Sequence, residues 1–214
     1  DRVDPRRLIA PAMGVSGVVV ALSPAVVRMA AEWAPPLLIL AASAAILVPG
    51  ALLSAVTPMV TKIRLSDLAD TGTVVGKLSG VGTVGAIAGT VITGFVLISR
   101  LPVSAILVGL GVLLVIGAAV VEWRAHGWVR SRAATLVVAL TVAALASAVA
   151  PGGCDAETKY HCAEVVADPD RDSGRTLVLD GLRHSYVDTA DPTVLQYDYV
   201  RALAAVVDLA FPDR

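Results

Sequence analysis

The sequence has few charged and few aromatic residues for its length. Of its 214 residues, 16% are charged and 4% are aromatic, whereas 56% are hydrophobic; an average soluble domain is about 25% charged. The scarce charge is also divided, because residues 1–150 carry 11 basic and 6 acidic side chains and residues 151–214 carry 6 and 12. An acidic segment lacks the basic surface that neutralises phosphates. The composition therefore argues against an ordinary soluble domain and against a nucleic-acid partner.

Residues 1–150 lack charge over long stretches, and these stretches predict helices that cross a membrane. A helix needs about 20 mainly apolar residues to cross the hydrocarbon core. Five stretches reach or approach this length: Leu8–Val27, Pro36–Val60, Leu78–Ile98, Leu101–Val121 and Ala133–Ala150. We therefore expect a mainly α-helical membrane protein, with a polytopic bundle of about five spans in residues 1–150 and a polar domain in residues 151–214.

Basic residues flank these spans mainly on one side. Nine lie before the first span, between the second and third, and between the fourth and fifth, whereas the other side has only Arg28 and Arg100. Because cytoplasmic loops are enriched in Lys and Arg, the N-terminus is expected in the cytoplasm and the acidic tail outside it. No span carries an ionisable residue near its centre, which argues against a proton-coupled transporter.

The third span contains a glycine motif with two interpretations. The residues Gly80-x-Gly82-x-x-Gly85 match a dinucleotide-binding fingerprint, but no convincing strand precedes them and the next acidic residue is Glu122. Close helix packing is the better interpretation, because glycines that recur every four residues line one face of a helix. These are Gly72, Gly76 and Gly80, and then Gly85 and Gly89.

The tail predicts two strands and a helix. Residues 157–167 and 175–180 are rich in β-formers and enclose the turn-forming run 168–174, which together predict a β-hairpin, followed by a polar stretch from Arg183 to Tyr186. Asp191 is expected to cap a helix that starts at Pro192. A hairpin and one helix cannot bury a stable core, so the tail is expected to need a partner.

The tail resembles the spermidine synthase family of aminopropyltransferases. The resemblance rests on the run Leu177-Val-Leu-Asp-Gly181, on His184-Ser185, on Asp191-Pro192 and on the tyrosine-containing helix that follows. The whole chain resembles the bacterial membrane-bound branch, which fuses a bundle of spans to such a domain in the inner or plasma membrane. The family has an N-terminal β-domain followed by a Rossmann-like domain that holds decarboxylated S-adenosylmethionine, whose aminopropyl group passes to an amine such as putrescine in polyamine biosynthesis.

The resemblance implies a set of substrate-binding residues. Tyr160 and Asp180 match a family tyrosine and the family's Asp-Gly, and Tyr197 or Tyr199 matches a substrate-side tyrosine. His161 and His184 stand where the family usually has glutamine, which puts a polyamine substrate in doubt. Without the resemblance, Tyr160 would be a packing residue, Asp180 a turn former and His184 a solvated loop residue.

The resemblance also implies what these 214 residues omit. The glycine-rich nucleotide loop and the catalytic Asp of the family are expected after Arg214, so we expect no catalytic residue, no cofactor and no metal in this chain, and no turnover by it. The expected partners are the lipid bilayer, a C-terminal Rossmann-like domain and other copies of the chain in a homo-oligomer. The alternative is a membrane transporter or scaffold that carries a degenerate synthase-like accessory domain.

Two cysteines lie near the point where the chain is expected to leave the membrane. A disulfide between Cys154 and Cys162 fits an exported segment, because exocytoplasmic compartments are oxidising. The alternatives are two unpaired thiols, or a metal site that includes His161. An exported tail conflicts with the resemblance, because the nucleotide donor is made in the cytoplasm.

Overall fold

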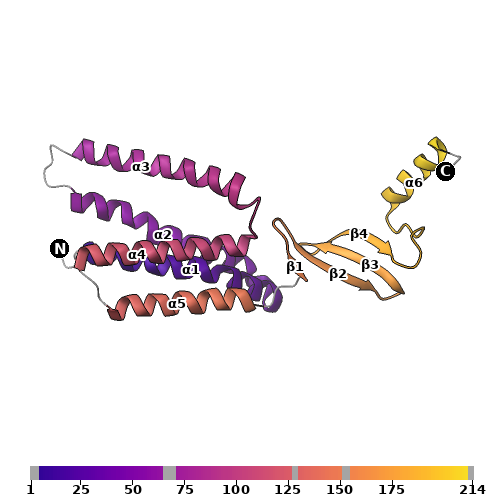
Figure 1. Cartoon of the computed structure of the whole chain (residues 1–214), viewed down its shortest axis with the longest axis horizontal. Coiled ribbons are helices and arrows are strands. Elements are labelled where there is room, and N and C mark those ends of the chain that lie inside the picture. The colour runs from indigo at the N-terminus through magenta and orange to yellow at the C-terminus, as the bar shows by residue number, and fades with distance from the viewer. Residues whose placement is uncertain (1–4, 65–70, 127–129, 151–154, 212–214) are drawn as a thin grey trace. The chain divides into compact units, whose positions relative to one another are not determined.

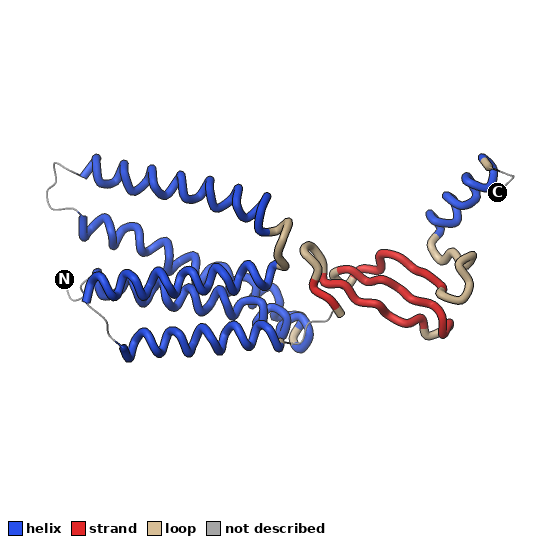
Figure 2. The backbone as a smooth tube through the Cα atoms, viewed as in Figure 1, coloured by secondary structure: helices blue, strands red, loops and turns tan. Residues whose placement is uncertain are grey.

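The computed structural model describes residues 5–64, 71–126, 130–150 and 155–211. These residues form two compact units, Asp1–Pro151 and Gly152–Arg214. Figure 1 shows helices in the first unit and a small sheet with one further helix in the second, and Figure 2 shows the same division by secondary structure. We call the first the membrane unit, because four of its described helices are long and apolar enough to cross a membrane, and the second the sheet unit.

The membrane unit consists of long apolar helices joined by short connections. Its elements are α1 (Arg6–Trp33), η1 (Pro35–Leu37), α2 (Leu38–Arg64), α3 (Thr71–Val91), the π-helical η3 (Ile92–Leu97), α4 (Val103–His126) and α5 (Arg130–Val149). Among the described residues, four helices are long and apolar enough to cross a membrane, and the apolar part of α5, Ala134–Val149, is shorter. The sequence therefore located all five helices, of which four have full membrane-spanning length.

Helix α1 is the centre of the membrane unit, and glycines let its neighbours approach closely. Most of the side chains in its apolar region are buried, against none for α3. A Cβ atom placed on Gly111 of α4 would lie 2.5 Å from the carbonyl oxygen of Gly17 in α1 and 2.8 Å from the Cβ of Ala21. The backbones of α1 and α4 are therefore in direct contact, as small residues allow in membrane bundles.

Polar contacts also join three helices at one end of the bundle. The guanidinium of Arg28 in α1 donates to the Ser104 hydroxyl of α4 over 2.6 Å and to the Ser147 carbonyl of α5 over 3.2 Å. The buried Ser147 hydroxyl in turn donates to the carbonyl of Ala21 over 2.5 Å. Arg28 thus satisfies a carbonyl in the last turn of α5, where helical carbonyls lack partners within the helix.

Helix α3 contains the glycine motif, and its structure bears on both interpretations of that motif. Residues 80–85 lie inside one continuous α-helix, so the strand–turn–helix geometry of a dinucleotide site is absent there. The predicted close packing is also not formed within the described residues, because nothing lies within 4 Å of a Cβ placed on any glycine of α3. The described part of the chain therefore leaves the glycine face of α3 uncovered.

Basic residues gather at one end of the membrane unit. Consecutive helices run in alternating directions (Figure 1), so the start of α1, the end of α2, the start of α3 and the end of α4 share that end. Arg6, Lys62, Lys77 and Arg124 lie there, while Arg28 lies toward the other. The basic residues that the sequence analysis placed on one side of the membrane thus lie at one end of the membrane unit.

The sheet unit is larger than the predicted hairpin. It is an antiparallel sheet with the strand order β1-β2-β3-β4. Its strands are β1 (Ala156–Glu157), β2 (Cys162–Asp168), β3 (Arg171–Leu179) and β4 (Leu182–Asp188). The polar stretch that the sequence left outside the hairpin is strand β4, which pairs with β3. It was missed because the strand carries polar side chains on both faces and therefore shows no apolar alternation.

The prediction that a helix starts at Pro192 is wrong. Helix α6 spans Asp198–Ala210, with Tyr197 at its N-cap position. Asp191 instead closes a single turn, because its carboxylate accepts from the backbone N–H of Thr193 over 3.0 Å and its carbonyl accepts from that of Val194 over 3.2 Å. Such local side-chain bonds compete with helix formation, and Asp strongly favours them.

Little of the sheet unit is buried. Among its described residues only Gly174, Thr176 and Asp188 are buried, and none of α6 is. The amphipathic face of α6 and both faces of the sheet therefore carry exposed apolar side chains, among them Val165, Leu182 and Leu203. The expectation that this unit needs a partner stays a prediction.

Replacement of Gly111 by alanine tests the contact between α1 and α4. We expect Gly111→Ala to lower the stability of the membrane unit by about 1–3 kcal/mol, the usual cost of overpacking, because its Cβ would meet backbone that cannot move aside. The thermal midpoint in detergent micelles, followed by tryptophan fluorescence, measures this, since all three tryptophans lie in that unit. Gly109→Ala on the same helix is the matched control, because nothing lies within 4 Å of its Cβ position; equal midpoints for the two variants would contradict the packing argument.

Candidate functional site

Four of the six residues expected to bind substrate gather at one end of the sheet. Strand β2 begins at Cys162, β3 ends at Leu179 and β4 begins at Leu182, and the register places these three positions side by side. The expected residues Tyr160, His161, Asp180 and His184 lie just before, between or just after these positions. We call this region the Asp180 end of the sheet.

Asp180 is at the centre of this region. Together with Gly181 it forms the two-residue turn between β3 and β4, and both have positive φ, 52° and 80°. An Asp-Gly pair favours this turn, because glycine adopts positive φ without cost and aspartate tolerates it. The sequence interpretation of Asp180 as a turn former therefore holds in the structure.

The carboxylate of Asp180 is bonded on both oxygens within the chain. Its Oδ1 accepts from the backbone N–H of Cys162 over 2.9 Å, and its Oδ2 lies 2.6 Å from Nδ1 of His161. The hydrogen bond from Cys162 and then that from His161 hold the pKa of Asp180 below its usual value. Asp180 thus joins the start of β2 to the turn between β3 and β4, although its side chain is about half exposed.

Tyr160 and His161 lie in a turn and not on the strand predicted for residues 157–167. Thr158 closes this turn, since its N–H and its hydroxyl both donate to the carbonyl of His161, over 2.8 and 2.7 Å. The His161 N–H donates back to the Thr158 hydroxyl over 2.9 Å. The turn leaves Tyr160 64% exposed, so it is not a cross-strand packing residue.

His184 lies at an irregularity in β4. Arg183 pairs with Val178 and Ser185 pairs with Leu177, so His184 is an extra residue without a partner on β3. Such β-bulges redirect a side chain and are common next to active sites. The side chain of His184 is exposed.

The two remaining expected residues, Tyr197 and Tyr199, lie away from the Asp180 end of the sheet. Tyr197 and Tyr199 stack on each other with ring centroids 5.8 Å apart and ring planes 22° apart. They lie at the start of α6, which the chain reaches after leaving β4 at Asp188, the end of the strand opposite to Asp180. The structure does not bring these two tyrosines to the Asp180 end of the sheet.

The opposite end of the sheet holds a polar network that the sequence analysis missed. The side chain of Asp188 is only 2% exposed; its Oδ2 accepts from Arg171 over 2.5 Å, and its Oδ1 accepts from the N–H groups of Ala190 and Asp191 over 2.9 and 3.0 Å. Nearby, the Tyr186 hydroxyl donates to Asp168 over 3.0 Å and lies against Gly174, where a Cβ would clash with it. In the sequence, the network is indicated only by Asp188, an acidic residue that directly follows the β-forming pair Tyr186 and Val187.

The structure tests only one of the two cysteines in the predicted disulfide. Cys162 is disulfide-bonded, and no described cysteine is free. Cys154 lies outside the described residues, so the predicted pairing of Cys154 with Cys162 stays a prediction. As for metals, no group of three His, Cys, Asp or Glu side chains in the described parts of the chain is arranged to hold an ion.

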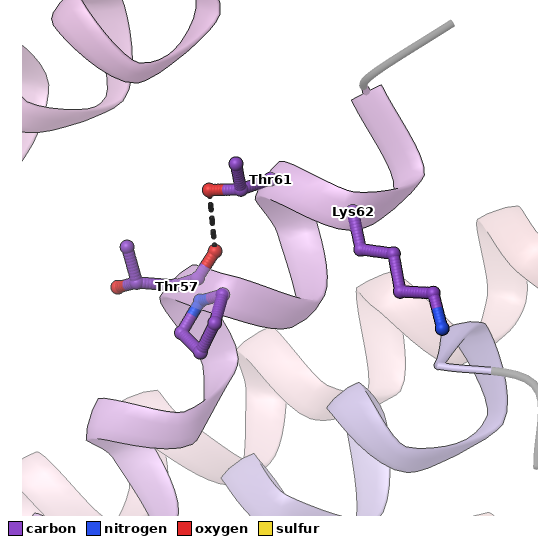
Figure 3. A pocket seen from close by; sticks show the side chains of 4 residues that line it. Thr57, Thr61 and Lys62 are labelled. Carbon is purple, nitrogen blue, oxygen red and sulfur yellow. Dashed lines mark hydrogen bonds between the residues drawn. The ribbon is translucent and has the colours of Figure 1, made fainter. Parts of the chain in front are cut away.

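The membrane unit has a shallow pocket on α2 that offers few groups able to bind or react with a ligand. It has a volume of about 680 Å³ and is lined by Thr57, Pro58, Thr61 and Lys62. Figure 3 shows the Thr61 hydroxyl donating to the carbonyl of Thr57, over 2.9 Å, so this hydroxyl is used within its own helix. The pocket offers one amine and no carboxylate or imidazole, and the Asp180 end of the sheet is the stronger candidate site.

No protein-family model, curated protein or solved structure matches the chain. The assignment of a function therefore depends on the residues and on their geometry.

The Asp188 network predicts how the sheet unit responds to acid. Hydrogen bonds, chiefly from Ser173 and then from backbone amides and Arg171, lower the pKa of Asp188 from 3.8 to about 2. Because the folded pKa lies below the unfolded one, the charged carboxylate stabilises the fold above about pH 4, and this stabilisation is lost as the pH falls to about 2. Near-ultraviolet circular dichroism of the tyrosines, all four of which lie in the sheet unit, follows the loss.

The variant Asp188→Asn identifies the group responsible. We expect it to be less stable than the native chain at neutral pH and to lose less signal between pH 4 and 2, because the titrating group is gone. Asp170→Asn, which changes an exposed carboxylate at the neighbouring turn, is expected to keep the native acid response. An unchanged acid response in Asp188→Asn would show that other carboxylates dominate.

Proposed function

We propose that this chain is the membrane-anchored, substrate-side part of a spermidine synthase-like aminopropyltransferase. The complete activity would transfer an aminopropyl group from decarboxylated S-adenosylmethionine to a polyamine such as putrescine. In this proposal the sheet unit supplies the amine side of the site, and a Rossmann-like domain supplies the nucleotide donor. The 214 residues alone are expected to have no turnover.

The convergence of four residues at the Asp180 end of the sheet carries this proposal. Tyr160 and His161 precede Asp180 by up to 20 positions in the sequence, yet a turn and a hairpin place all three at one end of the sheet, where His161 contacts Asp180. His184 adds an imidazole in the bulge of β4, at the same end of the sheet. Aromatic, imidazole and carboxylate groups are what recognition of an amine needs, because a ring face and an anion both attract an ammonium group.

The exposed surface of the membrane unit supports the lipid bilayer as its partner. Large apolar side chains are exposed along α2, α3, η3, α4 and α5, including Ile39 at 77%, Phe95 at 79% and Leu113 at 66%. A surface this apolar is unfavourable in water and favourable in hydrocarbon. We infer that these helices lie in a plasma or inner membrane and that α1 is their protein-covered centre.

Diamine binding tests the proposed function. We expect putrescine to shift the resonances of Tyr160 and His161 in the chain held in detergent micelles, because both side chains are exposed at the Asp180 end. The uncharged 1,4-butanediol, which has the same carbon length, is the ligand control and should cause no shift, and Tyr160→Ala should weaken the response to putrescine. A mixture with decarboxylated S-adenosylmethionine should give no product.

The outcomes of this experiment separate the alternatives. Product formation by the chain alone would refute the predicted lack of turnover. Equal responses to putrescine and the diol, or none to either, would refute the amine site. That result would favour the alternative, a transporter or scaffold with a degenerate accessory domain, of which the scaffold has support in the uncovered glycine face of α3 among the described residues.

The direction of insertion has its own test. Because the basic helix ends gather at one end of the membrane unit, we expect that end in the cytoplasm and the sheet unit outside it. Alkaline phosphatase, which folds only in an oxidising compartment, should be active when fused after Arg214 and inactive when fused after Arg124. The reverse pattern would place the sheet unit in the cytoplasm, on the side where the nucleotide donor is made.

A further inference from the structure

The geometry at Asp180 decides which nitrogen of His161 faces a ligand. The Nδ1 atom of His161 lies 2.6 Å from the Asp180 carboxylate, and an ionised carboxylate can only accept hydrogen bonds. Nδ1 therefore carries a proton whether the imidazole is neutral or charged. In the neutral ring the other nitrogen, Nε2, is then a hydrogen-bond acceptor.

Asp180 is itself held in one orientation. The backbone N–H of Cys162 donates to Oδ1 over 2.9 Å, and the Asp180 N–H donates to the carbonyl of Cys162 over 2.9 Å. These two bonds join the turn of Asp180 and Gly181 to the start of β2 and leave Oδ2 facing His161. Both oxygens of the Asp180 carboxylate are hydrogen-bonded within the chain, so His161 is better placed than Asp180 to contact a ligand.

We propose that Asp180 is a positioning residue that holds His161 in the tautomer protonated on Nδ1, so that Nε2 accepts a hydrogen bond from a ligand N–H of the primary-amine class. The ligand class rests on the proposed function; the tautomer does not. His161 is then the group that contacts the ligand, and Asp180 acts through it. The side chains of both residues are about half exposed, so the pair is open to a small ligand.

Substitution by asparagine reverses the tautomer without changing the shape of residue 180. In Asp180→Asn the fixed N–H of Cys162 still requires an acceptor, which keeps the amide oxygen on that side. The amide nitrogen then faces Nδ1 of His161 and donates to it. The His161 proton moves to Nε2, which becomes a donor and repels the N–H of an amine.

Nitrogen-15 spectroscopy of labelled histidine measures this directly. The full chain in detergent micelles contains only three histidines, and His161→Gln assigns the signal of His161. Near pH 8.5, where a free histidine is neutral, we expect protonated Nδ1 and bare Nε2 in the native chain and the reverse in Asp180→Asn. Asp170→Asn is the matched control, because this carboxylate lies at the other end of the sheet, and it should keep the native tautomer. The His184 signal, from a ring with no hydrogen-bond partner among the described residues, is the internal reference.

The second measurement is the change in the nitrogen-15 signal of His161 when putrescine is added. We expect it to shift Nε2 of His161 in the native chain and in Asp170→Asn, and to lose this effect in Asp180→Asn. The same tautomer in the native chain and in Asp180→Asn, or a native chain protonated on Nε2, would overturn the positioning role of Asp180 whatever putrescine does. The expected tautomers without any response to putrescine would overturn the amine assignment and the proposed function, and would leave the positioning role supported.

Discussion

Contact between two glycine backbones organises the membrane unit. Gly17 and Gly111 bring α1 and α4 so close that a single methyl group at either position would meet the backbone of the other helix. In a bilayer the hydrophobic effect does not drive helices together, so close packing and polar contacts must do so. The link from Arg28 to Ser104 and Ser147 completes this arrangement, and α1 becomes the one helix covered mainly by protein.

The sheet unit depends on carboxylates rather than on an apolar core. Asp180 joins the start of β2 to the turn between β3 and β4, and Asp188 joins β3 to the segment that leads to α6. Between these two anchors only a glycine and a threonine of the sheet are buried. Hydrogen bonds and turn geometry therefore define this sheet, which explains why its candidate site lies at a turn.

The accuracy of the sequence predictions follows the strength of each local signal. Long apolar runs located the five long helices of the membrane unit, four of which are long and apolar enough to cross a membrane, because the length required to cross a bilayer is a strong constraint. The Asp-Gly turn was recognised because this residue pair strongly favours a two-residue turn with positive φ. Strand β4 and the true start of α6 at Asp198 were missed, since an edge strand with polar residues on both faces has no apolar alternation and the turn at Asp191 resembles a helix cap.

The sequence by itself determined that the chain has a part with long apolar helices and an acidic polar part, which residues are basic at the helix ends, and where the Asp-Gly turn lies. Only the tertiary structure decided that α1 is the packed centre, that α3 is uncovered within the described residues, and that His161 lies against Asp180. The physical reason is distance along the chain. Hydropathy and turn preference act within a few residues, whereas these three features depend on contacts between residues far apart in the sequence.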